Sequence, residues 1–148
     1  EIARAFGAKV IYYSASGAPA QEGYEQVDFE TLLTQSDIIS VHAPLNEHTE
    51  GLINSKAFEK MKSSCIFLNL GRGPIVDEQA LYNALVRNQI AAAGLDVLCK
   101  EPMSADNPLL KIKDSKRLLI TPHIAWASVE ARTHLMEIIH GQVKDFFA

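Results

Sequence analysis

The stretch "SCIFLNLGRGPIVDEQALYNALVRN", residues 64–88, decides how the fold of this chain is interpreted. Its first part, residues 64–70, is short and apolar, which is typical of a buried β-strand. A Gly-Arg-Gly turn follows, and Asp77 then precedes a helical pattern over residues 78–88. Aspartate is a preferred residue at the start of a helix. The stretch therefore predicts a strand followed by a helix, which is the repeating unit of a parallel α/β sheet.

The same alternation of short apolar stretches and helical patterns extends over the whole chain. Further strands are predicted at residues 8–13, 37–42, 90–97 and 117–121. The other helical patterns cover residues 29–35, 56–62 and 129–147, and they are preceded by Asp28, Ser55 and Ser128. In the last pattern one apolar face is formed by Ala131, Leu135, Ile138 and Ile139. These features predict an open parallel sheet with helical crossovers.

The beginning of the chain is unusual for such a sheet. Residues 1–6 read as the tail of a helix that ends at Gly7, so the strand before that helix is expected to be missing. In dinucleotide-binding sheets the turn after that strand carries G-x-G-x-x-G, a pattern that does not occur here. The first methionine is Met61, which indicates a processed or truncated piece. Residues 1–148 are therefore expected to form a partial dinucleotide-binding domain of the α/β class. Its fold would be a Rossmann-like, doubly wound parallel sheet that lacks its first strand and glycine-rich turn.

Composition excludes some classes of function. The 148 residues are about the length of one domain, and a formal net charge of −4 argues against nucleic-acid or acidic-membrane partners. No apolar run in the sequence is long enough to span a bilayer. The two cysteines, Cys65 and Cys99, lack metal-ligand spacing, so no metal site is predicted and a cytoplasmic location is favoured.

Polar residues follow three of the predicted strands. Arg72 comes after the third strand, Asp96 and Glu101 come at and after the end of the fourth, and His123 follows the fifth. Open α/β sheets bind ligands at the carboxyl ends of their strands, so Arg72, Glu101 and His123 are expected to converge on one crevice. Each residue alone has a plainer explanation. Arg72 could be a solvated side chain in a tight turn, and Glu101 could lie in a surface loop. His123 could be a structural residue, and Asp96 could hold a loop in place.

The set as a whole favours catalysis. The planar guanidinium group of Arg72 suits a carboxylate, which it can hold through two hydrogen bonds. His123 can give or take a proton near neutral pH, and a neighbouring Glu101 would stabilise the protonated ring and fix its orientation. A carboxylate clamp and a proton donor on a dinucleotide-type sheet suggest hydride transfer between a nicotinamide and a 2-oxo or 2-hydroxy acid.

The chain resembles the D-isomer-specific 2-hydroxyacid dehydrogenases in four long blocks that follow in the family's order. The blocks are "SDIISVHAPLNEHTEGLIN", "NLGRGPIVDEQAL", "GLDVLCKEP" and "ITPHIAWASVEAR". The resemblance implies that Arg72 binds the substrate carboxylate. It also implies that His123, paired with Glu101, is the general acid in reduction and the base in oxidation. "HIAWAS" is most similar to the glycerate dehydrogenase and hydroxypyruvate reductase subgroup. Trp126 is then either a packing residue or a wall of the substrate end of the cleft.

The resemblance also implies an NAD site. The residues expected to contact the cofactor are Ser14, His42, Ala43, Pro44, Leu70, Gly71, Arg72, Asp96, His123 and Ala125. Among them, Asp96 would hold the nicotinamide carboxamide, and residues 42–44 would lie beside the adenosine. Ser14 departs from the family, which usually has an acidic residue there for the adenosine ribose. Because serine does not repel the 2′-phosphate of NADP, NAD is expected to be preferred and NADP to be tolerated.

The sequence is therefore interpreted as the nucleotide-binding part of an NAD-dependent D-2-hydroxyacid dehydrogenase, an oxidoreductase whose partner is a small 2-oxo or 2-hydroxy acid. The family's separate substrate-binding domain is expected to be absent from this chain, so the isolated piece should be inactive. The resemblance also implies a homodimer for the parent protein. The alternative is a non-enzymatic NAD-sensing scaffold like the corepressors that resemble this family, because these keep the same arginine, glutamate and histidine.

Overall fold

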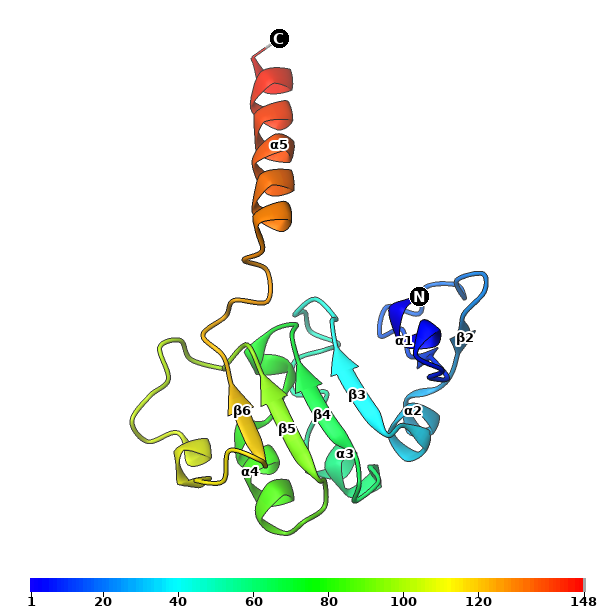
Figure 1. Ribbon diagram of the computed structural model, residues 1–148, viewed down its shortest axis with the longest axis vertical. Coiled ribbons are helices and arrows are strands. Elements are labelled where there is room, and N and C mark those ends of the chain that lie inside the picture. The colour runs from blue at the N-terminus through cyan, green and yellow to red at the C-terminus, as the bar shows by residue number, and fades with distance from the viewer. Residues whose placement is uncertain (148) are drawn as a thin grey trace.

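The computed structural model describes residues 1–147, and a four-stranded parallel sheet lies at its centre (Figure 1). Its strands, in their order across the sheet, are β3 Ile38–Val41, β4 Ile66–Asn69, β5 Ala92–Leu95 and β6 Leu118–Ile120. Every pairing is parallel, with Ile39 opposite Phe67 and Leu95 opposite Ile120. The carboxyl ends of all four strands therefore lie at one edge of the sheet, where Figure 1 shows the arrowheads. The predicted Rossmann-like α/β fold is confirmed.

Short helices connect the strands, and side chains just before them explain where they begin. The helices of the body are α2 Phe29–Gln35, α3 Ser55–Lys60 and α4 Glu78–Val86, with the 3-10 helices η1 Gly73–Ile75 and η2 Pro108–Lys111. Asp28 and Asp77 each accept a hydrogen bond from a backbone N–H group of the first turn, at 2.8 and 2.9 Å, as predicted. The predicted start of α3 is wrong by one residue, because Asn54 is the capping residue and Ser55 is already helical.

The core lies between the central sheet and the helices α3 and α4. Alternate strand residues are buried, since side chains point to opposite faces along a strand. On the covered face, the rings of Phe58 in α3 and Phe67 in β4 meet edge to face with centroids 5.4 Å apart, and both are fully buried. On the other face Ile38, Ile66 and Leu119 are exposed. The strands β3, β4 and β5 of the central sheet thus bury their side chains on one face.

Residues 8–13 contain a strand, but this strand does not belong to the central sheet. β1 Ile11–Tyr12 pairs in parallel with β2 Glu25–Gln26, and the two form a separate small sheet. The expectation that residues 8–13 join the other strands is therefore wrong, and β2 has no counterpart in the prediction. An apolar run indicates a strand without specifying its neighbour. Within residues 1–147 the only strand paired with β3 is β4, so no hydrogen-bonded strand links β1 to the central sheet.

The two terminal helices stand apart from the core. α1 Ile2–Ala5 is followed by Gly7 in the left-handed conformation at φ +83°, as the glycine signal predicts. α5 Val129–Phe146 begins after its capping residue Ser128, as predicted, and extends away from the central sheet (Figure 1). No residue of α5 is buried, so its predicted apolar face packs against nothing in the described chain.

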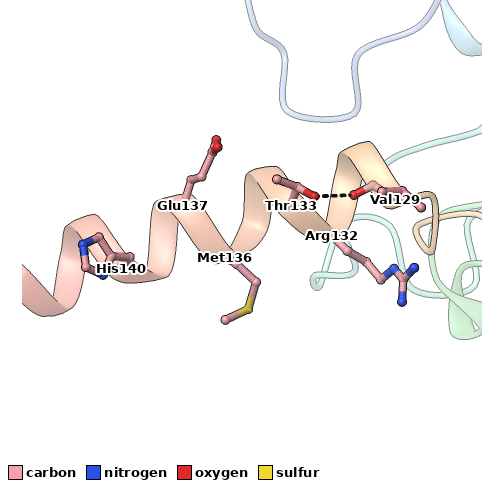
Figure 2. A pocket seen from close by; sticks show the side chains of 6 residues that line it. All are labelled: Val129, Arg132, Thr133, Met136, Glu137 and His140. Atoms are coloured by element: carbon pink, nitrogen blue, oxygen red, sulfur yellow. Dashed lines mark hydrogen bonds between the residues drawn. The ribbon is translucent and has the colours of Figure 1, made fainter.

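A shallow hollow runs along α5, and every residue that lines it belongs to that helix (Figure 2). The lining residues are Val129, Arg132, Thr133, Met136, Glu137 and His140. One side of a single helix encloses a ligand poorly, so the hollow is not a candidate site. Among residues 1–147, no helix is both long enough and apolar enough to cross a membrane.

Candidate active site

Three loops at the carboxyl edge of the central sheet carry the polar residues that the sequence singles out. Arg72 follows β4, Asp96 directly follows β5, and His123 follows β6. The three strands are neighbours and run in the same direction. The structure therefore places these loops side by side at the edge where open α/β sheets bind their ligands.

His123 and Glu101 form a hydrogen-bonded pair, as expected from the resemblance. Nδ1 of His123 lies 2.8 Å from Oε2 of Glu101, and the two side chains are 39% and 38% exposed. Because a carboxylate only accepts hydrogen bonds, Nδ1 is the donor and Nε2 is the nitrogen left to face a substrate. The other oxygen of Glu101 accepts the N–H group of Leu98 at 2.9 Å. That hydrogen bond, followed by the one from His123, lowers the pKa of Glu101, so its carboxylate is charged at neutral pH.

The backbone of His123 adopts a left-handed conformation, which residues other than glycine rarely adopt. Its φ is +55°, in the left-handed region. The carbonyl of His123 accepts a hydrogen bond from the indole Nε1 of Trp126 at 2.8 Å. Trp126 is 53% exposed, so it is not a core residue of the described chain, and its indole holds the turn that carries His123. A role for Trp126 as a wall of the substrate end stays a prediction.

Asp96 contacts the same turn from the neighbouring strand and is only 4% exposed. Its carboxylate accepts hydrogen bonds from the hydroxyl group of Thr121 at 2.5 Å and from the N–H groups of Ile124 and Ala125 at 2.9 and 2.8 Å. Burial alone would raise the pKa of Asp96, but these hydrogen bonds outweigh it and hold the pKa below its usual value. Asp96 is therefore charged and engaged with the protein. Its contact with a nicotinamide carboxamide stays a prediction.

The turn that carries Arg72 is held by a buried asparagine. Asn69, the last residue of β4, is 1% exposed, and its amide NH₂ group donates to the carbonyl of Arg72 at 3.0 Å. The amide oxygen of Asn69 accepts the N–H group of Gly71 at 3.1 Å. The guanidinium group of Arg72 donates to the carbonyl of Gly71 at 2.9 Å, and the residue as a whole is exposed. The side chain of Arg72 is thus exposed to solvent, while the buried Asn69 holds the backbone of its turn.

The Arg72 turn is packed against the loop that carries Glu101. A Cβ atom at Gly73 would lie 2.0 Å from the carbonyl atoms of Leu98, so the backbone of that loop leaves room only for glycine. Leu98 is also the residue whose N–H group binds Glu101. The positions of the arginine and the glutamate are therefore coupled through one backbone contact.

Three residues that hold these loops are missing from the sequence-based prediction, namely Asn69, Glu78 and Thr121. Glu78, the first residue of α4, accepts hydrogen bonds from the N–H group of Cys99 and the amide of Asn107, each at 2.8 Å. Asn69 could have been found as a polar residue within an apolar strand. Glu78 and Thr121 carry no such signal, because their partners are distant in the sequence.

The loops after β3 and β4 touch each other. Residues 42–44 follow β3, and a Cβ atom at Gly71 would lie 3.0 Å from the carbonyl oxygen of Ala43. The ring of His42 is hydrogen-bonded through Nε2 to the hydroxyl group of Ser40 at 2.8 Å. The predicted adenosine loop therefore lies directly beside the predicted arginine turn.

Leu70 is 40% exposed just beyond β4, and Ala125 is exposed in the loop after β6. Ser14 lies after β1, outside the central sheet, where its hydroxyl group is 3.1 Å from that of Ser16. All the predicted site residues except Ser14 are thus attached to the carboxyl edge of the central sheet. The apolar and polar groups of this edge suit the rings and amide of a dinucleotide. Within the described residues, no group of three or more His, Cys, Asp or Glu side chains is arranged to hold a metal ion.

Comparison with known proteins identifies the family. Residues 1–125 match the family model described as "D-isomer specific 2-hydroxyacid dehydrogenase, NAD binding domain". Over 148 residues the chain is 45% identical to a hydroxypyruvate reductase of Blautia hydrogenotrophica. This alignment covers 99% of the chain and 45% of that relative.

Solved structures agree with this match. An acyclic imino acid reductase in complex with NADPH and D-Arg has a TM-score of 0.87 at 38% identity, with 99% of this chain and 45% of the other covered. A D-lactate dehydrogenase from Aquifex aeolicus, complexed with NAD and lactic acid, has a TM-score of 0.87 at 29% identity, with coverages of 99% and 48%. The chain spans less than half the length of each of these relatives.

The parallel sheet and the residues at its carboxyl edge define a nucleotide-binding α/β domain of the Rossmann type. With the family match, the chain belongs to the D-isomer-specific 2-hydroxyacid dehydrogenase family, of which it matches the NAD-binding domain. The relatives described above are reductases or dehydrogenases, so they give no support to the alternative of a non-enzymatic scaffold.

Proposed function

We propose that this chain is the greater part of the nucleotide-binding domain of an NAD-dependent D-2-hydroxyacid dehydrogenase, whose substrate-binding domain belongs to the rest of the protein. The whole enzyme would transfer a hydride between NAD(H) and a 2-oxo or D-2-hydroxy acid. The hydrogen bond between His123 and Glu101 at the sheet edge is the observation that carries this proposal. His123 is a proton donor paired with the fixed carboxylate of Glu101, and the loop of Glu101 lies between those of His123 and the exposed Arg72. This arrangement suits reduction of a 2-oxo acid.

The chemical roles of the residues follow from these contacts. Arg72 would hold the substrate carboxylate through its planar guanidinium group. In reduction, Nε2 of His123 would donate a proton to the oxygen of the 2-oxo group, and in oxidation it would take that proton back. Glu101 would stabilise the ring while it is protonated. Bound NADH supplies the hydride.

The cofactor would lie along the loops that follow β3 to β6. Residues 42–44 would contact the adenosine, Leu70 and Gly71 would line the middle of the cleft, and Asp96 and Ala125 would meet the nicotinamide end. Ser14 would sit near the adenosine ribose, where it leaves the 2′-phosphate of NADP unrepelled. Relatives solved with NADPH and with NAD support the use of either cofactor on this fold.

The substrate and the setting of the whole protein are proposed from separate observations. The similarity to a hydroxypyruvate reductase supports a hydroxypyruvate or glycerate substrate. The two cysteines are free thiols, which suits a cytoplasmic location. The net charge of −4 speaks against a nucleic-acid partner. A homodimer is proposed from the family resemblance.

The test is turnover of a panel of 2-oxo acids by the full-length protein with NADH and with NADPH. The His123→Gln variant is expected to lower kcat for reduction by roughly 10² or more, the range of general acid-base assistance. His134→Gln is the matched control, because His134 also lies near a glutamate, 3.7 Å from Glu137, but on the exposed helix α5. NADH binding without turnover of any 2-oxo acid would contradict the proposed function.

A further inference from the structure

We infer that Asp96 is a positioning residue, which braces the backbone on both sides of His123 and so sets the direction in which the imidazole points. The inference rests on the proposed function, because it concerns the acid-base group of that reaction. It assigns to Asp96 an action on the protein's own loop, separate from any contact with the cofactor. The placement of its hydrogen bonds, the backbone of His123 and the chemistry of a buried carboxylate carry the argument.

The residues that donate hydrogen bonds to Asp96 lie on both sides of His123 in the sequence. Oδ1 accepts the hydroxyl group of Thr121 at 2.5 Å and the N–H group of Ile124 at 2.9 Å. Oδ2 accepts the N–H group of Ala125 at 2.8 Å. Asp96 directly follows β5, whereas the turn follows β6, so these bonds tie the turn to the end of the neighbouring strand. The backbone cannot rotate at His123 without moving a group that Asp96 holds.

The backbone of His123 needs such support. At φ +55° it occupies a region that is strained for histidine and persists only when the surroundings determine it. Its N–H group donates to the carbonyl of Thr121 at 3.0 Å, and its carbonyl is held by the indole of Trp126. If the turn were released, the residue would relax toward negative φ. The ring would then swing away from Glu101 and from the place where a substrate oxygen arrives.

The chemistry of the side chain explains why an aspartate stands here. A buried charge is costly unless it is hydrogen-bonded, and Asp96 is 4% exposed. Its two oxygens accept hydrogen bonds from three donors of the turn. An asparagine offers one oxygen, and its NH₂ group would face an N–H donor instead of accepting from it. The turn is therefore matched to a carboxylate and not to a neutral side chain of the same shape.

The first test is Asp96→Asn in the full-length protein. We expect kcat for 2-oxo acid reduction to fall roughly 10- to 100-fold, because small misplacement of a catalytic group costs up to about that much. The Kd for NADH, measured by fluorescence, is expected to rise by a smaller factor than kcat falls, because the contact proposed between Asp96 and the nicotinamide end is only one of the contacts that hold the cofactor. Asp114→Asn is the matched control: Asp114 also accepts a backbone N–H group, that of Lys116 at 2.9 Å, but in the exposed loop before β6, and it should leave kcat unchanged.

Thr121→Val supplies a second test that does not remove the carboxylate. It deletes one of the three hydrogen bonds, so a smaller fall in kcat at unchanged Kd for NADH is expected. This variant also carries the test if Asp96→Asn does not fold. In a double-mutant cycle, Asp96→Asn should lower kcat no further once His123 has been replaced by glutamine, because the ring that it positions is gone.

Two results would overturn the inference. A raised Kd for NADH with unchanged kcat would show that Asp96 acts on the cofactor, and additive effects in the cycle would show that it acts independently of His123. The ring nitrogen NMR shifts of His123 supply a readout that needs no activity, and they should change in Asp96→Asn but not in Asp114→Asn. If the wild-type protein turns over no 2-oxo acid, the proposed function is wrong and these shifts alone decide whether Asp96 positions the ring.

Discussion

Glu101 has two tasks in this structure, since one carboxylate oxygen holds the N–H group of Leu98 and the other holds the ring of His123. Both hydrogen bonds favour the charged form, with the one from Leu98 the stronger cause, so the pKa of Glu101 lies below its ordinary value of 4.5. The pair is therefore intact above that ordinary value and is lost as the pH falls through the lowered pKa. At neutral pH the glutamate is not the group that limits the reaction.

Replacing Glu101 with glutamine should change the pH profile of 2-oxo acid reduction. A neutral amide stabilises a protonated ring less than a carboxylate does, so the pH at which reduction declines on the alkaline side should move lower. The profile of kcat/KM against pH measures this shift. Glu137→Gln is the control, because Glu137 lies near His134 on an exposed helix. An identical alkaline limb in Glu101→Gln and the wild type would show that the pair has no role in proton transfer.

At the scale of the elements, the loops after β4 and β5 are in contact, and a glycine allows their backbones to lie close together. The second glycine of the Gly-Arg-Gly turn lies against the backbone of Leu98, and Leu98 in turn fixes Glu101. Glu78 in the first turn of α4 adds a further link, because it binds the loop after β5 at Cys99. The β4 turn, α4 and the β5 loop thus form one assembly around the candidate active site.

Gly73→Ala should therefore be harmful although alanine is a small residue. Its Cβ atom would lie 2.0 Å from the backbone of Leu98, and overpacking of this kind costs typically about 1–3 kcal/mol. Thermal unfolding of the full-length protein should show a lower Tm, and kcat should fall with it. Gly141→Ala is the control, since Gly141 lies in α5 with open space around it and alanine favours helices by up to about 1 kcal/mol. A Gly73→Ala variant as stable and active as the wild type would mean that the two loops separate easily.

At the scale of the whole molecule, apolar side chains are exposed on one face of the central sheet and along α5. One face of the central sheet carries Ile38 and Leu119 at 60% and 62% exposure, and α5 has no buried residue. β3 also has an edge that is unpaired within residues 1–147. Exposed apolar patches and unpaired strand edges favour contact with other chains or segments.

The isolated 148-residue chain is therefore expected to associate in solution. Sedimentation velocity at increasing concentration should show species larger than the monomer. Replacing both Ile38 and Leu119 with lysine should reduce this association, because charged residues on exposed strands oppose pairing. Val86→Lys is the control, since Val86 is 54% exposed but lies on α4, away from the open face. A wild-type chain that stays monomeric at every concentration would contradict the expectation.

The sequence by itself determined the strand-helix alternation, the helix starts at Asp28 and Asp77, and the strand ends that carry Arg72 and His123. These features are local: apolar runs and capping residues act within a few positions, so they can be recognised one segment at a time. The roles of Arg72, Glu101 and His123 came from the chemistry of the three side chains together with the family resemblance.

Only the tertiary structure decided which segments meet. It placed β1 in a separate sheet, because an apolar strand does not specify its partner. It turned the indole of Trp126 onto the carbonyl of His123 and left the apolar face of α5 uncovered, because burial depends on neighbours and not on composition. It also joined Asp96 to Thr121 and Glu78 to Cys99, since hydrogen bonds between residues far apart in the chain exist only once the strands are side by side.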